Sequence, residues 1–171
     1  MSRIVSLIVL LLFIRVCSAA PVLALNADFS QIQLGLHTDF ICDSAANMTL
    51  EQARHSRAWQ QSNVAVPNFG FTSDHYWFRV PLRAERDFSN LIVEVGYALL
   101  DSVDYYLERD GEIIAHHRVG NAVDFNQRPL KHPLPLFPLQ LEKDKNYVLY
   151  FYVSSANSMQ VPLSLWSERA F

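Results

Sequence analysis

The chain has 171 residues, of which 50% are hydrophobic and 12% aromatic, and its formal net charge at pH 7 is −3. One domain with a substantial core is expected at this length. The acidic balance argues against nucleic acid and against an anionic membrane surface as partners.

A secretory signal peptide is predicted over residues 1–20. It has a basic start at Arg3, an apolar run over Ile4–Ile14 and small residues over Cys17–Ala20, which are the three parts of such a signal. The apolar run is too short to cross a membrane. A lipoprotein signal at Cys17 is the alternative, and the large residues just before Cys17 disfavour it.

Cleavage would leave residues 21–171 as one exported domain, expected in the periplasm. The loss of Arg3 and Arg15 moves the net charge from −3 to −5. Cys42 would then be the single cysteine, so no intramolecular disulfide is available, and its thiol is expected to be buried. No other stretch reaches the roughly 18 apolar residues that a membrane-spanning helix needs.

A strand and a helix are the first elements predicted after the signal. Apolar residues alternate with polar or small ones over Gln31–Leu36, which predicts a strand with an extension through Phe40. Thr49 followed by Gln52 is a capping box, and it predicts a short helix over Leu50–Trp59.

The pattern after the helix is typical of β structure. Pro67–Gly70 is expected to be a loop. Alternation with period two then predicts strands over His75–Leu82, Leu91–Tyr97, Val103–Leu107, Ile113–Val119, Tyr147–Ser154 and Val161–Trp166. Asp110-Gly111 is a strong signal for a two-residue hairpin between the third and fourth of these strands.

The segment Asn121–Leu141 holds four of the chain's eight prolines. Proline fixes φ and removes a backbone donor, so a helix or a central strand is disfavoured there. Apolar residues and His132 still alternate with prolines and a lysine over Pro129–Leu136. A long loop carrying Arg128, followed by an edge strand whose prolines block further pairing, is therefore predicted. With it, the chain has about eight strands and one short helix, which predicts an all-β antiparallel sandwich.

Four motifs resemble those of a known family. Asn68–Phe71 followed by Tyr76–Arg79 is similar to its NFGYT…YW-x-R signature, and Leu99–Leu107 to its LLD-x-VD-x-YL strand. Gly120–His132 is similar to its GD…PF-x-x-RP-x-x-H segment, and Pro162–Phe171 to its PL-x-LWS…F ending. From about Gln33 to Phe171, the chain resembles the type 2 extracellular domain of bacterial receptors with seven transmembrane helices and diverse intracellular signalling modules.

The resemblance implies a jelly-roll β-sandwich like those of carbohydrate-binding modules, lying in the periplasm. It also implies a sensory role, in which a ligand binds outside and attached helices pass the change to a cytoplasmic diguanylate cyclase, phosphodiesterase or histidine kinase. Asn121 replaces the family's usual Asp, which removes one charge from the candidate site. The sequence ends at Phe171, about where membrane helices are expected to begin, so an orphan binding domain and an N-terminal part of a longer receptor are both open.

Five residues are candidate ligand contacts. Arg128 offers a fork-shaped donor for hydroxyls or a carboxylate, or else it pins the long loop through backbone carbonyls or acidic partners. His132 is a ligand contact or a satisfied core residue. Trp77 and Arg79 share one strand face, where an exposed tryptophan would stack on a sugar ring, or a buried one would lie beneath Arg79. Asp101 is expected to anchor a loop or to accept a hydrogen bond from a ligand.

No catalytic residue, metal site or cofactor is predicted. Asp101 and Asp104 suggest the carboxylate pair of a glycoside hydrolase, but their spacing of three directs them to different faces of a strand. His116 and His117 are adjacent and also face opposite ways, with no third metal ligand at useful spacing. The chain has no nucleophile elbow, zinc-protease helix motif or phosphate loop.

The leading hypothesis is a non-catalytic periplasmic sensory domain that binds a small polar ligand. A carbohydrate is the favoured ligand class by analogy with the fold, and analogy of fold does not establish function. The partners implied are that ligand, the membrane-embedded portion of a receptor if the chain is part of one, and a second copy in a homodimer. The alternative is a protein-interaction or dimerisation module with no small-molecule ligand.

Overall fold

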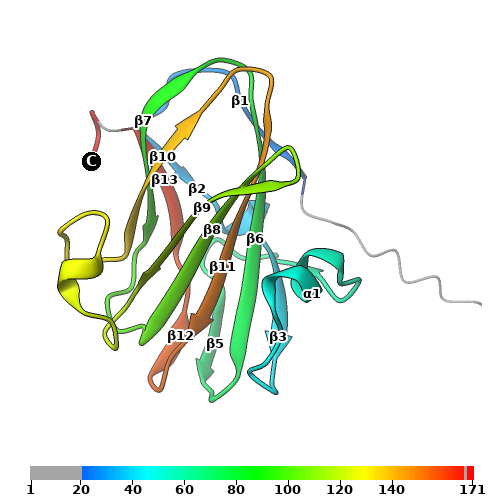
Figure 1. Ribbon diagram of the computed structural model, residues 1–171, viewed down its shortest axis with the longest axis vertical. Helices are drawn as coiled ribbons and strands as arrows, with labels where there is room; N and C mark the ends of the chain where they lie inside the picture. The colour runs from blue at the N-terminus through cyan, green and yellow to red at the C-terminus, as the bar shows by residue number, and fades with distance from the viewer. Residues whose placement is uncertain (1–20, 168) are drawn as a thin grey trace, which may run out of the picture.

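The computed structural model describes residues 21–167 and 169–171, which form a sandwich of two β-sheets (Figure 1). The signal peptide predicted over residues 1–20 lies outside the described residues. Within the described ranges, one α-helix, α1 (Leu50–His55), and two short 3-10 helices, η1 (Gly35–His37) and η2 (Phe125–Gln127), accompany the strands. No helix in this part of the chain is long and apolar enough to span a membrane.

The strands are β1 (Leu23–Leu25), β2 (Gln31–Gln33), β3 (Asp39–Asp43), β4 (Gln60–Gln61), β5 (Asn68–Phe71), β6 (His75–Ala84), β7 (Phe88–Val95), β8 (Ser102–Arg109), β9 (Glu112–Val119), β10 (Leu136–Leu141), β11 (Asn146–Ser154), β12 (Ser158–Gln160) and β13 (Leu163–Ser167). The larger sheet has the order β4-β3-β6-β11-β8-β9, with β1 also paired to β6, and the smaller sheet has the order β10-β7-β13-β2. Strands β5 and β12 form a separate two-stranded ribbon.

Eight of these strands form a jelly roll. If β2, β6, β7, β8, β9, β10, β11 and β13 are counted from one to eight, the smaller sheet has the order 6-3-8-1 and the core of the larger sheet has the order 2-7-4-5. This alternation of the chain between two antiparallel sheets is the jelly-roll topology. The predicted fold, an antiparallel jelly-roll sandwich of about eight strands, is confirmed.

The hydrophobic core lies between the two sheets. Phe78 and Phe151 of the larger sheet and Phe137 of the smaller sheet are fully buried. Tyr105 of β8 stacks on Phe137 with ring centroids 4.5 Å apart, so aromatic contacts join the sheets. Burial also raises the pKa of the Tyr105 phenol, because the ionised form would lose its hydration. Among the described residues, the buried members of this core run from Leu25 to Leu165.

The predicted hairpin between β8 and β9 is confirmed. Asp110 and Gly111 have φ angles of 48° and 91°, as a tight two-residue hairpin requires. The pairing then shifts by one residue between Leu107 and Glu108. A bulge of this kind changes which residues of the second strand share a face with the first.

The first predicted strand is wrong in its extent. The extended chain ends at Gln33, turns through η1, and resumes in β3 from Asp39. The break is needed because β2 belongs to the smaller sheet and β3 to the larger one. The predicted helix begins at its capping box but ends at His55, before Trp59. The Trp59 indole donates back to the carbonyl of Ala53 at 2.9 Å, so the chain has left the helix by then.

The predicted proline strand is also misplaced. The edge strand exists, but β10 begins only at Leu136 and contains a single proline, Pro138. The preceding prolines lie in a loop, which is yellow in Figure 1. This loop is curled because the amide of His132 donates to the carbonyl of Leu130 at 2.9 Å, a three-residue turn that an extended strand cannot contain.

Two smaller expectations are wrong as well. Most of Pro67–Gly70, expected to be a loop, belongs to β5 (Asn68–Phe71), which pairs with β12. The thiol of Cys42 is exposed rather than buried, and it lies 3.5 Å from Ser44 and from Asp74, which are polar residues outside the core.

Candidate functional site

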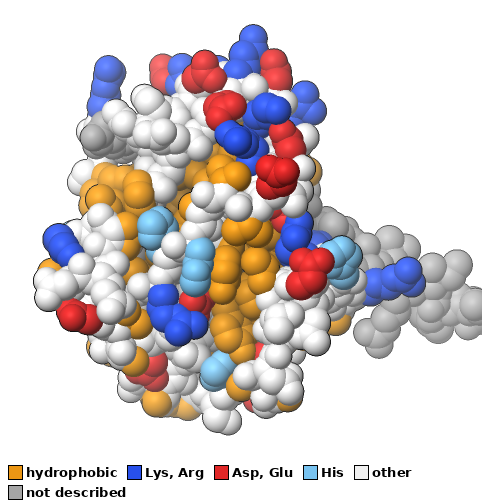
Figure 2. Space-filling view, viewed as in Figure 1, with side chains coloured by type: hydrophobic (Ala, Val, Ile, Leu, Met, Phe, Trp, Pro, Cys, Tyr) orange, Lys and Arg blue, Asp and Glu red, His pale blue; other side chains and the backbone are white. Residues whose placement is uncertain are grey.

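The outer face of the larger sheet is divided into two halves. Over β3 and β6 it is covered by the segment 44–62, which includes α1, and a second hydrophobic cluster forms beneath that segment around Ile41, Trp59 and Trp77. Over most of β8 and β9 no other described segment covers it, and α1 reaches this part of the sheet at its hairpin end, where Arg54 donates to Glu108 at 2.8 Å. Figure 2 shows an apolar strip along this face with histidine and arginine side chains beside it. We call these regions the covered half and the open half.

Trp77 and Arg79 both lie in the covered half. Trp77 is 2% exposed, and its indole donates to the carbonyl of Met48 at 3.1 Å. Arg79 pairs with the buried Asp39 at 2.8 Å, and its guanidinium lies 4.4 Å from the centre of the Trp59 ring. The expected stacking of a sugar on an exposed Trp77 is therefore not available in this conformation, and the alternative of a buried tryptophan describes the structure.

The open half has a buried carboxylate at its centre. Asp104 of β8 is 2% exposed, although it faces away from the core. Its Oδ1 accepts hydrogen bonds from Nε of Arg118 at 2.7 Å and from Nε2 of His116 at 3.0 Å. The carboxylate raises the pKa of Arg118 by stabilising its charged form. A buried carboxylate is rare without such pairing, so the cluster is a candidate site rather than ordinary surface.

Aromatic rings connect this cluster to the covered half. Tyr106 stacks on His116 with centroids 4.2 Å apart and planes 2° apart, and Trp77 stacks on Tyr152 at 4.7 Å. Burial, and then the charge of Asp104, raises the pKa of Tyr106. These phenols are therefore neutral at physiological pH and act as apolar surface and hydroxyl donors.

The Tyr152 hydroxyl is held at the border of the two halves. It donates to Asp43 at 2.8 Å and lies 2.9 Å from Nδ1 of His75. Burial and the hydrogen bond to Asp43 raise the pKa of Tyr152. Burial pushes the pKa of Asp43 upward, but hydrogen bonds from the Met48 amide and from Tyr152 outweigh it, so that pKa lies below its ordinary value.

A hollow of about 400 Å³ adjoins the cluster on its loop side. Arg118 forms one wall, and the others come from the start of β8 and from the loop after β9. The lining residues are Ser102, Arg118, Ala122, Val123, Asp124 and Gln127. Among the described residues, the hydrogen bonds of Arg118 use only its Nε, so both terminal nitrogens remain as donors for a ligand.

The other three predicted residues lie in the loops behind this hollow. Arg128 is 9% exposed, and its Nη1 donates to the carbonyls of His132 and Pro133 at 2.6 and 2.7 Å. Its Nη2 donates to the carbonyl of Gly120 at 3.4 Å. The ring of His132 accepts from the amide of Leu134 at 3.2 Å and meets the ring of Phe171 edge-on at 5.6 Å.

Asp101 holds the same loops from the opposite side. Its Oδ2 accepts from the amide of Ala156 at 2.5 Å, and its carbonyl accepts from the amide of Ala122 at 2.9 Å. A Cβ on Gly120 would lie 2.2 Å from the Asp101 carbonyl oxygen, so only glycine permits this contact. The structure thus brings Asp101, Arg128 and His132 into one loop cluster, and it places Trp77 and Arg79 elsewhere. Ligand contact by each of the five stays a prediction.

Sequence reasoning missed the residues at the centre of the open half. Asp104 was weighed only as half of a hydrolase pair and His116 only as a metal ligand, and Arg118 was not considered. The available signal was the hairpin itself, because counting outward from Asp110-Gly111 places β9 opposite β8. The bulge shifts that count by one residue and brings His116 and Arg118 onto the face of Asp104.

The two carboxylates weighed for hydrolysis, Asp101 and Asp104, do not converge on one site. Asp104 lies on the outer face of the larger sheet, and Asp101 lies in a loop. Glu94 belongs to β7 of the smaller sheet, where it accepts from the Trp166 indole. Over residues 21–167 and 169–171, no group of three His, Cys, Asp or Glu side chains is placed to hold a metal ion.

Comparison with known proteins identifies a family. The family model described as 7TMR-DISM extracellular 2 matches residues 35–167. No curated protein matches the chain. Among solved structures, the native structure of a family 35 carbohydrate binding module from Clostridium thermocellum is 12% identical, with a TM-score of 0.33, over 59% of this chain and 84% of that one.

Proposed function

We propose, from the premise that this chain belongs to the 7TMR-DISM extracellular 2 family, that it is a non-catalytic sensory domain that binds a small polar ligand in the periplasm. The family is one of extracellular sensor-type domains of receptors. The ligand class that we favour is a carbohydrate, and the site that we favour is the open half together with the adjoining hollow.

The observation that carries this proposal is the buried Asp104 with its two exposed partners. The side chains of Arg118 and His116 are 61% and 47% exposed, although the Asp104 carboxylate to which both are bound is buried. The carboxylate fixes Arg118, whose two terminal nitrogens are donors at the wall of the hollow, and the His116 ring beside it, which is how a binding site is preorganised. A sugar suits this surface because its hydroxyls can meet these donors while its C–H groups meet the apolar strip beside them.

The contacts of the loop cluster support a route for the signal. From the loop after β9, the hollow is lined by Ala122, Val123, Asp124 and Gln127, and Arg128 joins that loop to the carbonyl of His132. The ring of His132 in turn meets Phe171 near the C-terminus of the chain. A ligand that stabilises one arrangement of this loop would thereby shift the position of the C-terminal segment, because binding favours the state to which the ligand binds more tightly.

Calorimetric titration of residues 21–171 with a panel of mono- and disaccharides tests the proposal. Binding of at least one sugar is expected, with a loss of tenfold or more in Arg118→Ala, since hydrogen bonds to charged groups contribute about 1.5–3 kcal/mol. Arg83→Ala, an exposed arginine of β6, is the charge-matched control and should bind normally. Trp77→Ala and Arg128→Ala test the earlier site assignment, and unchanged binding in both would remove these residues from it.

A second candidate function, a dimerisation module, is favoured by the contrast between two edge strands. The smaller sheet ends at β10, whose Pro138 blocks pairing. The larger sheet ends at β9, where Ile113 and Ile114 are 38% and 42% exposed. Sedimentation of residues 21–171 decides between the two: a dimer that Ile114→Lys dissociates, with no binding of any sugar, would favour the interaction module over the sensor.

A further inference from the structure

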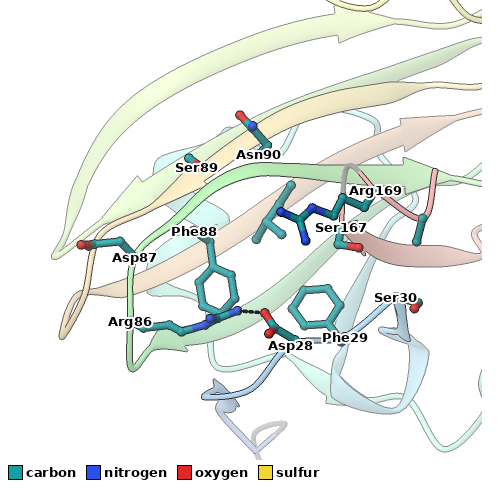
Figure 3. A pocket seen from close by; sticks show the side chains of 12 residues that line it. Asp28, Phe29, Ser30, Arg86, Asp87, Phe88, Ser89, Asn90, Ser167 and Arg169 are labelled. Atoms are coloured by element: carbon teal, nitrogen blue, oxygen red, sulfur yellow. Dashed lines mark hydrogen bonds and ion pairs between the residues drawn. The ribbon is translucent and has the colours of Figure 1, made fainter.

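A second and larger pocket lies away from the open half. Its volume is about 730 Å³, within the range of about 300–1,000 Å³ usual for small-molecule sites. Three segments form it: the residues before β2, the turn into β7, and the C-terminal turn, by which we mean Ser167, Arg169, Ala170 and Phe171 (Figure 3). None of these walls belongs to the face to which the proposed function assigns the ligand.

Two aromatic rings form an apolar side of this pocket. Phe29 and Phe88 lie with ring centroids 6.0 Å apart, and Phe88 is itself buried at 7% exposure. Around them stand neutral polar groups from Ser30, Ser89 and Ser167. A flat apolar group could rest on these rings while hydroxyls bind the polar part of the same molecule.

Arg86 supplies the first cation. Its guanidinium lies 4.6 Å from the centre of the Phe88 ring and pairs with Asp28. Its Nε is buried and has no hydrogen-bond partner among the described residues, and buried donors normally have one. The Asp28 side chain is 92% exposed, so it can move away into water if a better anion takes its place.

Arg169 of the C-terminal turn supplies the second cation. Arg169 lines the same pocket as Phe29 and Phe88, and Figure 3 shows its side chain extending from the C-terminal turn above these two rings. Within the described ranges, no hydrogen bond or ion pair holds its guanidinium. Asp87, the other acid of the lining, is already occupied, because it accepts from the Lys143 amide at 2.7 Å.

We infer that this pocket binds a small carboxylate whose apolar part rests on Phe29 and Phe88. The guanidinium group is planar and matches a carboxylate with two parallel hydrogen bonds, and it also stacks on aromatic rings. Arg86 already lies over such a ring and Arg169 can reach the same space. A carboxylate held by both arginines would replace Asp28 as the partner of Arg86.

Such a ligand would also tie the C-terminal turn to the turn that leads into β7. Ser167 donates to the carbonyl of Ser30 at 3.1 Å, and the amides of Ala170 and Phe171 both donate to the carbonyl of Ser167. These hydrogen bonds hold the turn together with the edge-on contacts of the Phe171 ring to His132 and Trp166. A carboxylate bridging Arg86 and Arg169 would add a link between the C-terminal turn and the turn that leads into β7, so amide hydrogen exchange of Ala170 and Phe171 should slow on binding.

The test uses ¹⁵N-labelled residues 21–171 titrated with benzoate, with benzamide as the uncharged probe of the same shape. Benzoate should shift the amide resonances of Ser30, Ser89 and Ser167, and benzamide should not. Arg169→Ala should weaken benzoate binding about tenfold or more, as expected for the loss of a charged hydrogen-bonding group. Arg86→Gln should have the same effect, and Arg83→Ala, at an exposed arginine that lines neither pocket, should have none.

Three results would overturn the inference. Equal binding of benzamide would show that the rings bind any flat molecule, and equal binding of inorganic phosphate would show a site for any anion. Unchanged benzoate binding in Arg169→Ala would show that the second cation is not used. Arg169 is on the surface, so this variant should fold even if Arg86→Gln, which removes a group packed on Phe88, does not. None of these outcomes bears on sugar binding at the open half, so the two proposals fail separately.

Discussion

Two of the buried carboxylates on the outer face of the larger sheet are each paired with an arginine of a neighbouring strand. Asp39 meets Arg79 at 2.8 Å in the covered half, and Asp104 meets Arg118 at 2.7 Å in the open half. The side chain of Arg79 is 22% exposed and that of Arg118 is 61% exposed. The pairs have the same chemistry, and the segment 44–62 makes the difference, because it covers one arginine with Trp59 and leaves the other facing solvent.

The largest effect on stability is expected from Trp77→Ala, which removes a buried side chain from the covered half. Removing a fully buried tryptophan leaves a cavity between the sheet and the covering segment, and about 3–5 kcal/mol should be lost from the free energy of unfolding. Urea denaturation measures this loss. Leu99→Ala, at a side chain that is 50% exposed, should change stability by no more than about 0.5 kcal/mol. Similar losses in the two variants would contradict the packing described for Trp77.

The next largest difference is expected between the stability losses of the two arginine variants. Arg79→Ala removes the arginine that pairs with the buried Asp39 carboxylate, and the free energy of unfolding should fall by about 3 kcal/mol. Arg118→Ala leaves Asp104 with His116 and a route to water, so its cost should be about 1 kcal/mol or less. Urea denaturation of both variants gives the comparison. If Arg118→Ala proved the more destabilising, the pair in the open half would be structural and its role as a ligand site would be weakened.

The stabilising contribution of Asp43, at the border between the halves, should be lost in acid. The pKa of Asp43 lies below its ordinary value because hydrogen bonds from Met48 and Tyr152 outweigh its burial. Its stabilising contribution is therefore complete above the unfolded-state pKa of about 3.9 and is lost as the pH falls through the lower folded-state pKa. Unfolding free energies measured between pH 7 and pH 2 should fall less steeply below about pH 4 in Asp43→Asn. Identical slopes in the two proteins would show that other groups govern the acid response.

The smallest effect is expected from Tyr106→Phe, which keeps the ring stacked on His116 and removes only the hydroxyl. Stability should change by about 1 kcal/mol or less, in line with a single hydrogen-bonding group. Sugar affinity should fall less than in Arg118→Ala, because the ring and the charged donor remain. Calorimetric titration of the two variants with one sugar gives the ranking, and the reverse order would make the hydroxyl the principal contact.

The strands were predictable because their period-two pattern reflects one buried face. The hairpin at Asp110-Gly111 was predictable for a local reason, since few residues adopt positive φ easily. The turn of the proline loop was not predictable, because it depends on the hydrogen bonds that Arg128 donates to the carbonyls of His132 and Pro133. The secondary-structure propensities of the residues in this segment do not reveal a hydrogen bond from a side chain to these carbonyls.

The candidate site was predictable only in part. Arg128 and Asp101 were identified as residues of interest, with loop anchoring as one alternative for each, and both make backbone contacts in the loops behind the hollow. The cluster around Asp104 depends on the bulge after Leu107. Without it, counting from the hairpin would place His117, not His116 and Arg118, on the face of Asp104. A one-residue irregularity therefore decides the composition of the site.

The central claim is that the open half, and not the covered half, binds the ligand. Amide resonances of ¹⁵N-labelled residues 21–171, followed during titration with the sugar that binds best, test it most directly. The account predicts shifts concentrated at Tyr106, His116, Arg118 and the loop Ala122–Gln127, with little change around Trp59 and Arg79. Shifts confined to the covered half or to the pocket beside Phe88, or the absence of shifts with every sugar of the panel, would contradict it.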